Sequence, residues 1–273
     1  MCGTGRIRIM KKIISVILAA AALVTMTACG AKKTETASDM DYIKDKGNMV
    51  IGYTLFAPMN YMENGELIGF ETDLAKAVCE KLGVEAKFQE INWDSKEMEL
   101  NSKTIDCIWN GMTITDERKE NMSISEPYMG NRQVIVVKKD KAEALGNSLD
   151  GAKVVAEAGS AGEETAKSDS FFEKAEFTAV DSQAKGLMEV KAGVSDAVVL
   201  DYIMALGSVG EGTDYSDLTI IDKNFEEEEY GIAFRKGSDV TAKVEEAVKE
   251  LAADGTLKQI ADRYKLTDLL LIK

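Results

Sequence analysis

The sequence predicts an α/β protein built from two successive series of strands and helices. Strand-like apolar runs alternate with segments whose apolar residues recur every three or four positions, a pattern typical of helices covering a mostly parallel sheet. The 273 residues suffice for one large domain or two small lobes. The second series ends in a strand and helices that could return to the first. We therefore expect two lobes connected by two extended segments, near 131–138 and 226–235.

The first series begins at residue 49. Its strands are predicted from apolar and β-branched runs at 49–53, 84–88 and 105–109. A helix that opens at Glu71 or Thr72 should end at Gly83, because glycine readily adopts the left-handed conformation of a helix C-terminus. Thr115 is a suitable N-cap for a short helix over 116–121.

The second series begins after a fully apolar strand. That preceding strand is predicted at 134–137, and the strands of the series itself at 153–156, 177–180, 196–200, 218–221 and 230–234. Helices are expected from Gly162 and from Ser182. Two further helices end the chain, each with one apolar face, from Val240 to Leu251 and from Leu257 to Tyr264.

Composition excludes several functions. The formal net charge of −14 argues against nucleic acid or an anionic membrane surface as the main partner. The absence of histidine from the sequence removes Ser-His-Asp triads, Cys-His pairs and histidine-ligated metal sites. We therefore expect a binding protein rather than an enzyme, with no metal and no cofactor.

The first 28 residues are predicted to be a lipoprotein signal peptide. Four cationic residues precede the apolar run 13–24, and small residues follow it. Met26-Thr27-Ala28-Cys29 resembles a lipobox, in which Cys29 would be acylated and would begin the mature chain. An ordinary secretory peptide is the alternative. Residues 29–46 are polar and are expected to form a flexible tether.

The remaining mature cysteines, Cys79 and Cys107, lie in a helical and a strand-like pattern respectively. Neither has the spacing of a metal site. We expect both to be buried small apolar residues, and a disulfide between them stays open at this point.

Several motifs occur in a characteristic order: Ile51-Gly52, 65–74, 105–118, 125–128, Gly159-Ser160, Asp201 and 253–256. With the lipobox in front, this set resembles the bacterial extracellular solute-binding proteins of family 3, the amino-acid receptors of ABC importers. The resemblance covers about residues 48–266. It implies a two-lobed periplasmic-binding-protein-like fold of type II, with lobe 1 at 47–134 and 230–273, lobe 2 at 135–229, and two hinge strands.

The resemblance also implies partners and a location. They are a free amino acid bound between the lobes, a membrane permease of the ABC transporter, and a lipid anchor that holds a monomeric, extracytoplasmic protein to the cell membrane.

Arg118 is the candidate for the ligand carboxylate. It lies three residues after the candidate N-cap Thr115, in the first turn of a helix. A guanidinium beside the free N–H groups of a helix N-terminus can bind a carboxylate in bidentate fashion. The resemblance assigns the same role to this arginine.

The other candidates follow strand ends, where open α/β sheets collect ligands. Asn110, Gly111 and Thr113 are implied to contact the α-amino and α-carboxyl groups, and Asp201 the ammonium. Plain turn and N-cap roles are the alternatives. In the turn at Gly159, the N–H groups of Ser160 and Ala161 could hold the carboxylate from the second lobe.

Phe56 and Trp93 are implied to be aromatic walls of the pocket, and the half-polar surroundings of Trp93 favour partial exposure. Glu157, just before the Gly159 turn, would favour a cationic or amide side chain over an anionic one. The expected ligands are therefore polar or basic: glutamine, arginine, lysine, histidine or cystine. The aspartate that often follows the first strand in relatives with basic ligands is absent here.

Two other functions stay open. An enzyme such as a cyclohexadienyl dehydratase could use the same scaffold, with Glu157 and Asp201 as an acid–base pair. A ligand-sensing lipoprotein that takes no part in transport is the other.

Overall fold

The computed structural model describes residues 38–272. The predicted signal peptide and Cys29 lie outside this range. Within it, no helix combines the length and apolar character needed to cross a bilayer.

Apart from one short hairpin, the described strands form one continuous hydrogen-bonded array, which divides into two sheets. In the first sheet, β1 (Asn48–Tyr53) pairs in parallel with β4 (Glu85–Glu90) on one side and β5 (Cys107–Thr113) on the other. The strand β12 (Glu227–Arg235) pairs antiparallel with β5 and with the short β6 (Met122–Ile124). In the second, β8 (Lys153–Glu157) pairs in parallel with β9 (Glu176–Val180) and β10 (Ala197–Asp201). The antiparallel β7 (Met129–Lys138) lies beside β10 and carries β11 (Leu218–Ile221). A separate hairpin joins β2 (Tyr61–Glu63) and β3 (Glu66–Ile68).

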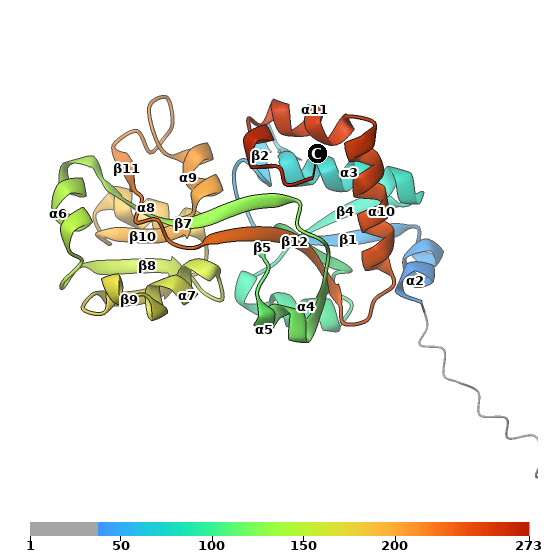
Figure 1. The fold of residues 1–273 in the computed structure, drawn as a ribbon, viewed down its shortest axis with the longest axis horizontal. Coiled ribbons are helices and arrows are strands. Elements are labelled where there is room, and N and C mark those ends of the chain that lie inside the picture. Colours follow the sequence, from blue (N-terminus) through green and yellow to red (C-terminus); the bar gives the residue numbers. More distant parts are fainter. Residues whose placement is uncertain (1–37, 273) are drawn as a thin grey trace, which may run out of the picture. The chain divides into compact units, whose positions relative to one another are not determined.

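Two long strands connect the sheets, as Figure 1 shows for β7 and β12. Residues 129–132 of β7 pair with 227–230 of β12, while the rest of each strand pairs within its own sheet. The predicted α/β class with two lobes and two hinge strands is therefore confirmed. We call the part around the first sheet the first lobe and the part around the second sheet the second lobe.

Helices cover both sheets (Figure 1). The first lobe carries α2 (Asp39–Lys46), α3 (Phe70–Leu82), α4 (Lys96–Asn101), α5 (Asp116–Asn121), α10 (Val240–Ala253) and α11 (Thr256–Arg263). The second lobe carries α6 (Ala142–Asn147), α7 (Ala161–Ser168), α8 (Gln183–Ala192) and α9 (Tyr202–Ser208). Single 3₁₀ turns occur at Trp93–Ser95, Lys139–Lys141, Ser170–Phe172 and Thr267–Leu269.

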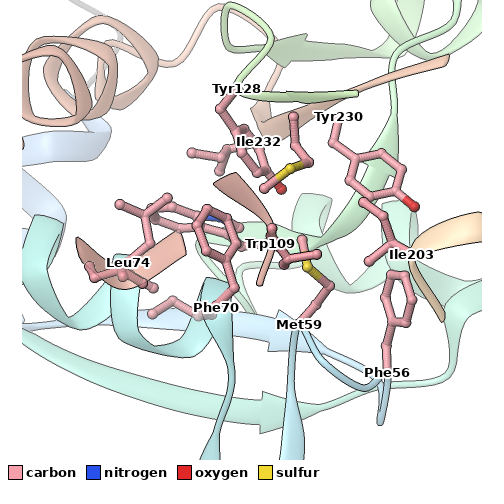
Figure 2. Packing of buried hydrophobic residues seen from close by; sticks show 14 of the residues in the cluster. Phe56, Met59, Phe70, Leu74, Trp109, Tyr128, Ile203, Tyr230 and Ile232 are labelled. Atoms are coloured by element: carbon pink, nitrogen blue, oxygen red, sulfur yellow. The ribbon is translucent and has the colours of Figure 1, made fainter. Parts of the chain in front are cut away.

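The largest buried cluster extends from one lobe to the other. Phe70 of α3 stacks on Tyr128, with ring centroids 6.3 Å apart, beside the fully buried Trp109 of β5. Figure 2 shows that Ile203 of α9 lies between Tyr230 of the hinge and Phe56 of the first lobe. Apolar contact thus joins the lobes next to the residues that the sequence assigns to the ligand.

The expected tether over residues 29–46 is wrong for its last eight residues. They form α2, whose Met40 and Ile43 are buried. Asp39 also pairs with Arg235 of β12 at 2.9 Å. Two apolar residues at helical spacing, with ion pairs of Asp39 to Arg235 and Lys103 and of Lys46 to Asp106, fix this segment to the first lobe, and the polar composition obscured that pattern. The exact lobe boundaries stay a prediction, because β7 and β12 each belong to both sheets.

Cys79 and Cys107 are buried free thiols. Burial raises the pKa of Cys79 to about 12, and that of Cys107 also lies well above its ordinary value. The prediction that both cysteines are small buried core residues is confirmed, and the structure has no disulfide between them.

Candidate functional site

One cavity between the lobes collects the candidate residues. The first lobe contributes Phe56, Trp93, Asn110, Gly111, Thr113 and Arg118. The second lobe contributes Glu157, Ser160, Ala161 and Asp201, together with Gln183, which sequence reasoning missed. The cavity volume of about 10 Å³ holds one water at most. An amino acid can therefore enter only when the lobes move apart.

Arg118 spans the boundary between the lobes. The hydroxyl of Thr115 accepts from the Arg118 backbone N–H at 3.2 Å, so the predicted N-cap holds and orients the first turn of α5. The guanidinium is buried: its Nη1 donates to the carbonyl of Thr113 at 2.8 Å. Its Nη2 donates across the cleft to the carbonyl of Gly159 at 3.4 Å and to Glu164 Oε1 at 2.9 Å.

The turn at Gly159 receives a second cation. Lys96 Nζ of α4 donates to the Gly159 carbonyl at 3.0 Å and lies 4.9 Å from the centroid of the Trp93 ring. Burial, and then the nearby charge of Arg118, lower the pKa of Lys96 to about 8. Gly159 has φ +68°, a conformation that favours glycine, so this turn presents its carbonyl to both cations.

The neighbouring Ser160 differs from expectation. Its hydroxyl caps α7 by accepting from the N–H of Glu163 at 3.1 Å, and its own N–H donates to the carbonyl of Glu157 at 3.2 Å. The N–H of Ser160 is thus used within the turn rather than directed at a ligand. Ala161 begins α7 and borders the cavity.

Asn110 lies inside β5 rather than after a strand, and its side chain is fully used. Its Oδ1 accepts from the N–H and hydroxyl of Thr54, at 3.0 and 2.7 Å. Its Nδ2 donates to the Thr54 carbonyl at 2.9 Å and to Asn60 Oδ1 at 2.8 Å. These four bonds are all that a primary amide makes. Asn110 therefore shapes the wall by fixing the loop after β1.

Gly111 and Thr113, also in β5, face different partners. Gly111 has φ +56°, and a Cβ there would lie 2.4 Å from the Phe56 ring. Its N–H donates to Glu71 at 2.8 Å, a carboxyl whose pKa burial raises to about 7. The hydroxyl of Thr113 donates to Glu228 at 3.2 Å.

Asp201 is the N-cap of α9, but its side chain makes no capping bond. Its carboxylate instead accepts from the amides of Asn131 at 2.5 Å and Gln133 at 3.0 Å, from Tyr230 Oη at 2.8 Å, and from Gln183. Burial raises the pKa of Asp201, while these donors oppose the rise. The plain N-cap interpretation is therefore wrong.

A second hinge carboxylate, Glu228, lies beside Asp201. It accepts from Asn131 at 3.1 Å and from Gln133 at 3.0 Å, so the same two amides bridge both acids. Burial, and then the charge of Asp201, raise the pKa of Glu228. The Glu226–Glu229 run would ordinarily be taken as a solvated loop, and Glu228 is the exception because β12 turns alternate side chains inward. The same alternation along β7 puts Asn131 and Gln133 on one face of that strand. This period of two was the signal in the sequence from which the roles of these residues could have been predicted.

Glu157 lines the cavity from the end of β8 and is 3% exposed. Its Oε1 has no hydrogen-bond partner within the described residues. Burial, and then the charge of Asp201, raise the pKa of Glu157 to about 8, while Lys96 and Gln183 oppose the rise. A buried acceptor without a partner is costly, so this oxygen is suited to a donor on a ligand.

The aromatic residues are more enclosed than expected. Trp93 is 5% exposed, so the predicted partial exposure is wrong. Its side chain packs under Lys96 and belongs to a buried apolar cluster that includes Leu100 and Ile108. Phe56 is 3% exposed and contacts the backbone of Gly111.

Across residues 38–272, no group of three or more histidine, cysteine, aspartate or glutamate side chains is arranged to hold a metal ion.

Known proteins share this fold. Residues 49–267 match the family described as bacterial extracellular solute-binding proteins, family 3. The chain belongs to this family. The arginine-binding extracellular protein ArtP of Bacillus subtilis is 31% identical over 258 residues, which cover 93% of this chain and 98% of ArtP.

Solved structures agree. A histidine-bound substrate-binding protein of an ABC uptake transporter from Streptococcus pneumoniae is 28% identical, with a TM-score of 0.79 over 86% of this chain and 99% of that one. The ancestral amino-acid-binding protein AncCDT-1, a precursor of cyclohexadienyl dehydratase, is 32% identical, with a TM-score of 0.74 over 83% and 99%. The family 3 assignment therefore rests on sequence and on fold together.

Proposed function

We propose that this family 3 protein captures a free amino acid between its lobes and delivers it to the permease of an ABC importer. Arg118 takes the α-carboxylate and Asp201 the α-ammonium. The observation that carries this proposal is the convergence of Arg118, from the first lobe, and Asp201, from the second, on one cavity with no covalent machinery required. A zwitterion supplies a carboxylate for Arg118 and an ammonium for Asp201.

The ligand side chain meets Glu157. Its unpartnered buried oxygen favours a hydrogen-bond donor. Glu157 and Asp201 border the cavity together with Arg118, while Glu228 lies beside Asp201 and Lys96 beside the Gly159 turn. Once the zwitterion occupies Arg118 and Asp201, a positive charge on the ligand side chain favours the ionised form of Glu157, and an anionic side chain opposes it. We therefore propose a cationic side chain, arginine before lysine or histidine, with glutamine as the uncharged alternative. The similarity to ArtP supports this order.

Thermal unfolding tests the assignment. The protein is unfolded and refolded to remove carried-over ligand and is then heated with each proteinogenic amino acid and with cystine. A ligand at about a thousand times its Kd should add roughly 4 kcal/mol of stability. For a protein of this size that is on the order of 8–16 °C in Tm. No shift with any amino acid would refute the proposed clamp.

A catalytic role is the second candidate. Its specific support is the raised pKa of Glu157 and of Asp201, together with the similarity to AncCDT-1. We propose that the protein is not an enzyme, because Arg118 and Asp201 suit a zwitterion rather than the dicarboxylate prephenate. Release of product from prephenate or arogenate at a rate that Glu157→Gln abolishes would reverse this conclusion.

We further propose that the protein is a monomer held at the outer face of the cell membrane by lipid on Cys29. Labelling with a radioactive fatty acid should occur in the native chain and be lost in Cys29→Ser. Equal labelling of the two would contradict the lipobox.

A further inference from the structure

We propose that Glu164 competes with the α-carboxylate of the ligand for Arg118, so that this residue of α7 sets how strongly binding depends on that carboxylate. The inference rests on the proposed function, since it takes Arg118 as the group that binds the ligand carboxylate.

In this structure, Arg118 already binds the carboxylate of Glu164. Nη2 carries two N–H groups, and both have acceptors in the second lobe: the carbonyl of Gly159 at 3.4 Å and Glu164 Oε1 at 2.9 Å. An end-on bidentate carboxylate needs one N–H from Nη1 and one from Nη2. A ligand carboxylate that binds in this way must therefore displace one of the two acceptors.

Glu164 is the acceptor that can leave. The Gly159 carbonyl belongs to a fixed backbone turn and also accepts from Lys96 at 3.0 Å. The Glu164 side chain is 54% exposed, whereas that of Arg118 is 6% exposed. A partly exposed carboxylate can rotate into water at little cost, since ion pairs of this kind are weak. The Arg118–Glu164 contact also joins α5 of the first lobe to α7 of the second, so it holds the lobes together until a ligand replaces it.

Competition by Glu164 and a bridging role that persists in the complex predict opposite changes in ligand affinity when the charge of Glu164 is removed. If the ligand displaces Glu164, removal of its charge tightens the binding of a carboxylate ligand. If Glu164 instead stays on Arg118 in the complex, removal loosens it.

The decisive variant is Glu164→Gln, with Glu143→Gln as the matched control. Glu143 is an exposed acid of α6 in the same lobe, so its replacement changes the net charge equally. Calorimetry would compare L-arginine with L-argininamide, in which the α-carboxylate is replaced by a neutral amide. We expect Glu164→Gln to lower the Kd of L-arginine by about twofold to fivefold, which corresponds to roughly 0.4–1 kcal/mol, while argininamide binding stays unchanged or weakens.

Three results would overturn the inference: an unchanged or raised Kd for L-arginine in Glu164→Gln, an equal gain in Glu143→Gln, or an equal gain for both probes. If no amino acid binds the native protein, the proposed function fails. The Arg118–Glu164 contact can still be tested without ligand, by measuring the separation of the lobes. Spin labels on Lys87→Cys and Lys174→Cys, exposed positions in the two lobes, would report the lobe separation without ligand. A shift to longer distances in Glu164→Gln supports the contact, and identical distances refute it.

Discussion

Arg118 and Asp201 carry the opposite charges of the cavity, yet their surroundings differ in origin. The donors to Asp201 come from the second lobe and the hinge strands, through Gln183, Asn131 and Tyr230 among others. The partners of the Arg118 Nη2 atom lie across the cleft. The surroundings of Asp201 can therefore persist when the lobes part, whereas those of Arg118 must change. If Asp201 accepts the ligand ammonium and Arg118 binds its carboxylate, as proposed, the ammonium acceptor is preorganised and the carboxylate site is completed by closure.

The largest effect is expected from Arg118→Ala. Two charge-assisted hydrogen bonds at roughly 1.5–3 kcal/mol each are lost, so the Kd of the bound amino acid should rise by about 100-fold or more. Arg118→Lys keeps the charge but not the planar fork, and its Kd should fall between the two. Isothermal titration measures all three proteins. A Kd within threefold of the native value in Arg118→Ala would remove the arginine from the site.

Asp201→Asn should differ from the Arg118 variants because it should lower the stability of the ligand-free protein as well as ligand affinity. The Kd should rise by roughly 10–100-fold, because the acceptor loses its charge. Its new amide group must also face amide and hydroxyl donors, so the ligand-free protein should lose about 1–3 kcal/mol of stability. Differential scanning calorimetry should show this as a drop of roughly 2–10 °C in Tm. Asp150→Asn, at a fully exposed acid of the same lobe, serves as the control. An unchanged Tm would mean that Asp201 is not preorganised.

Glu157 should make the unfolding free energy of the ligand-free protein depend on pH. Because burial raises its pKa from 4.5 to about 8, the folded ligand-free protein binds this proton more tightly than the unfolded chain does. The resulting stability is fully present below about pH 4.5 and is lost as the pH rises toward 8. Glu157→Gln should therefore show a shallower fall of the unfolding free energy between pH 5 and 8, measured by urea denaturation. Parallel curves for the two proteins would contradict the raised pKa.

A cationic ligand should also release this proton at pH 7, because a nearby positive charge favours the ionised carboxylate. Calorimetry in two buffers of different ionisation enthalpy detects the release as a difference in apparent binding enthalpy, and Glu157→Gln should reduce that difference.

The smallest effect is expected at Glu228. Its charge lies beside Asp201 and both share the amides of Asn131 and Gln133, so Glu228→Gln relieves repulsion. We expect a gain of about 0.5–1 kcal/mol in ligand-free stability at pH 8 and no gain at pH 5, where the carboxyl is already protonated. A loss of stability at pH 8 would show that Glu228 acts mainly as a hydrogen-bond acceptor.

The sequence predicted the cavity better than it predicted the roles of its members. The ordered motifs and the family resemblance located ten of the eleven described residues that border the cavity and missed Gln183. They did not reveal that Asn110 uses its entire amide on Thr54 and Asn60, or that the Ser160 N–H closes its own turn. The partners of Asn110 lie 50 or more positions away in the chain and leave no local pattern there. The Ser160 bond spans only three residues, but it depends on the conformation of the turn at Gly159.

What the sequence determined by itself is the two-lobed α/β fold, the N-cap at Thr115 that orients Arg118, and the family, because each depends on local spacing or on motif order. The tertiary structure alone decided the pairing of Arg118 with Glu164, the cage around Asp201 and the burial of Glu228. The physical reason is that the charge balance of the cavity depends on groups brought together from β5, α7, β10 and both hinge strands. Their distances, and therefore their energies, exist only once the lobes meet.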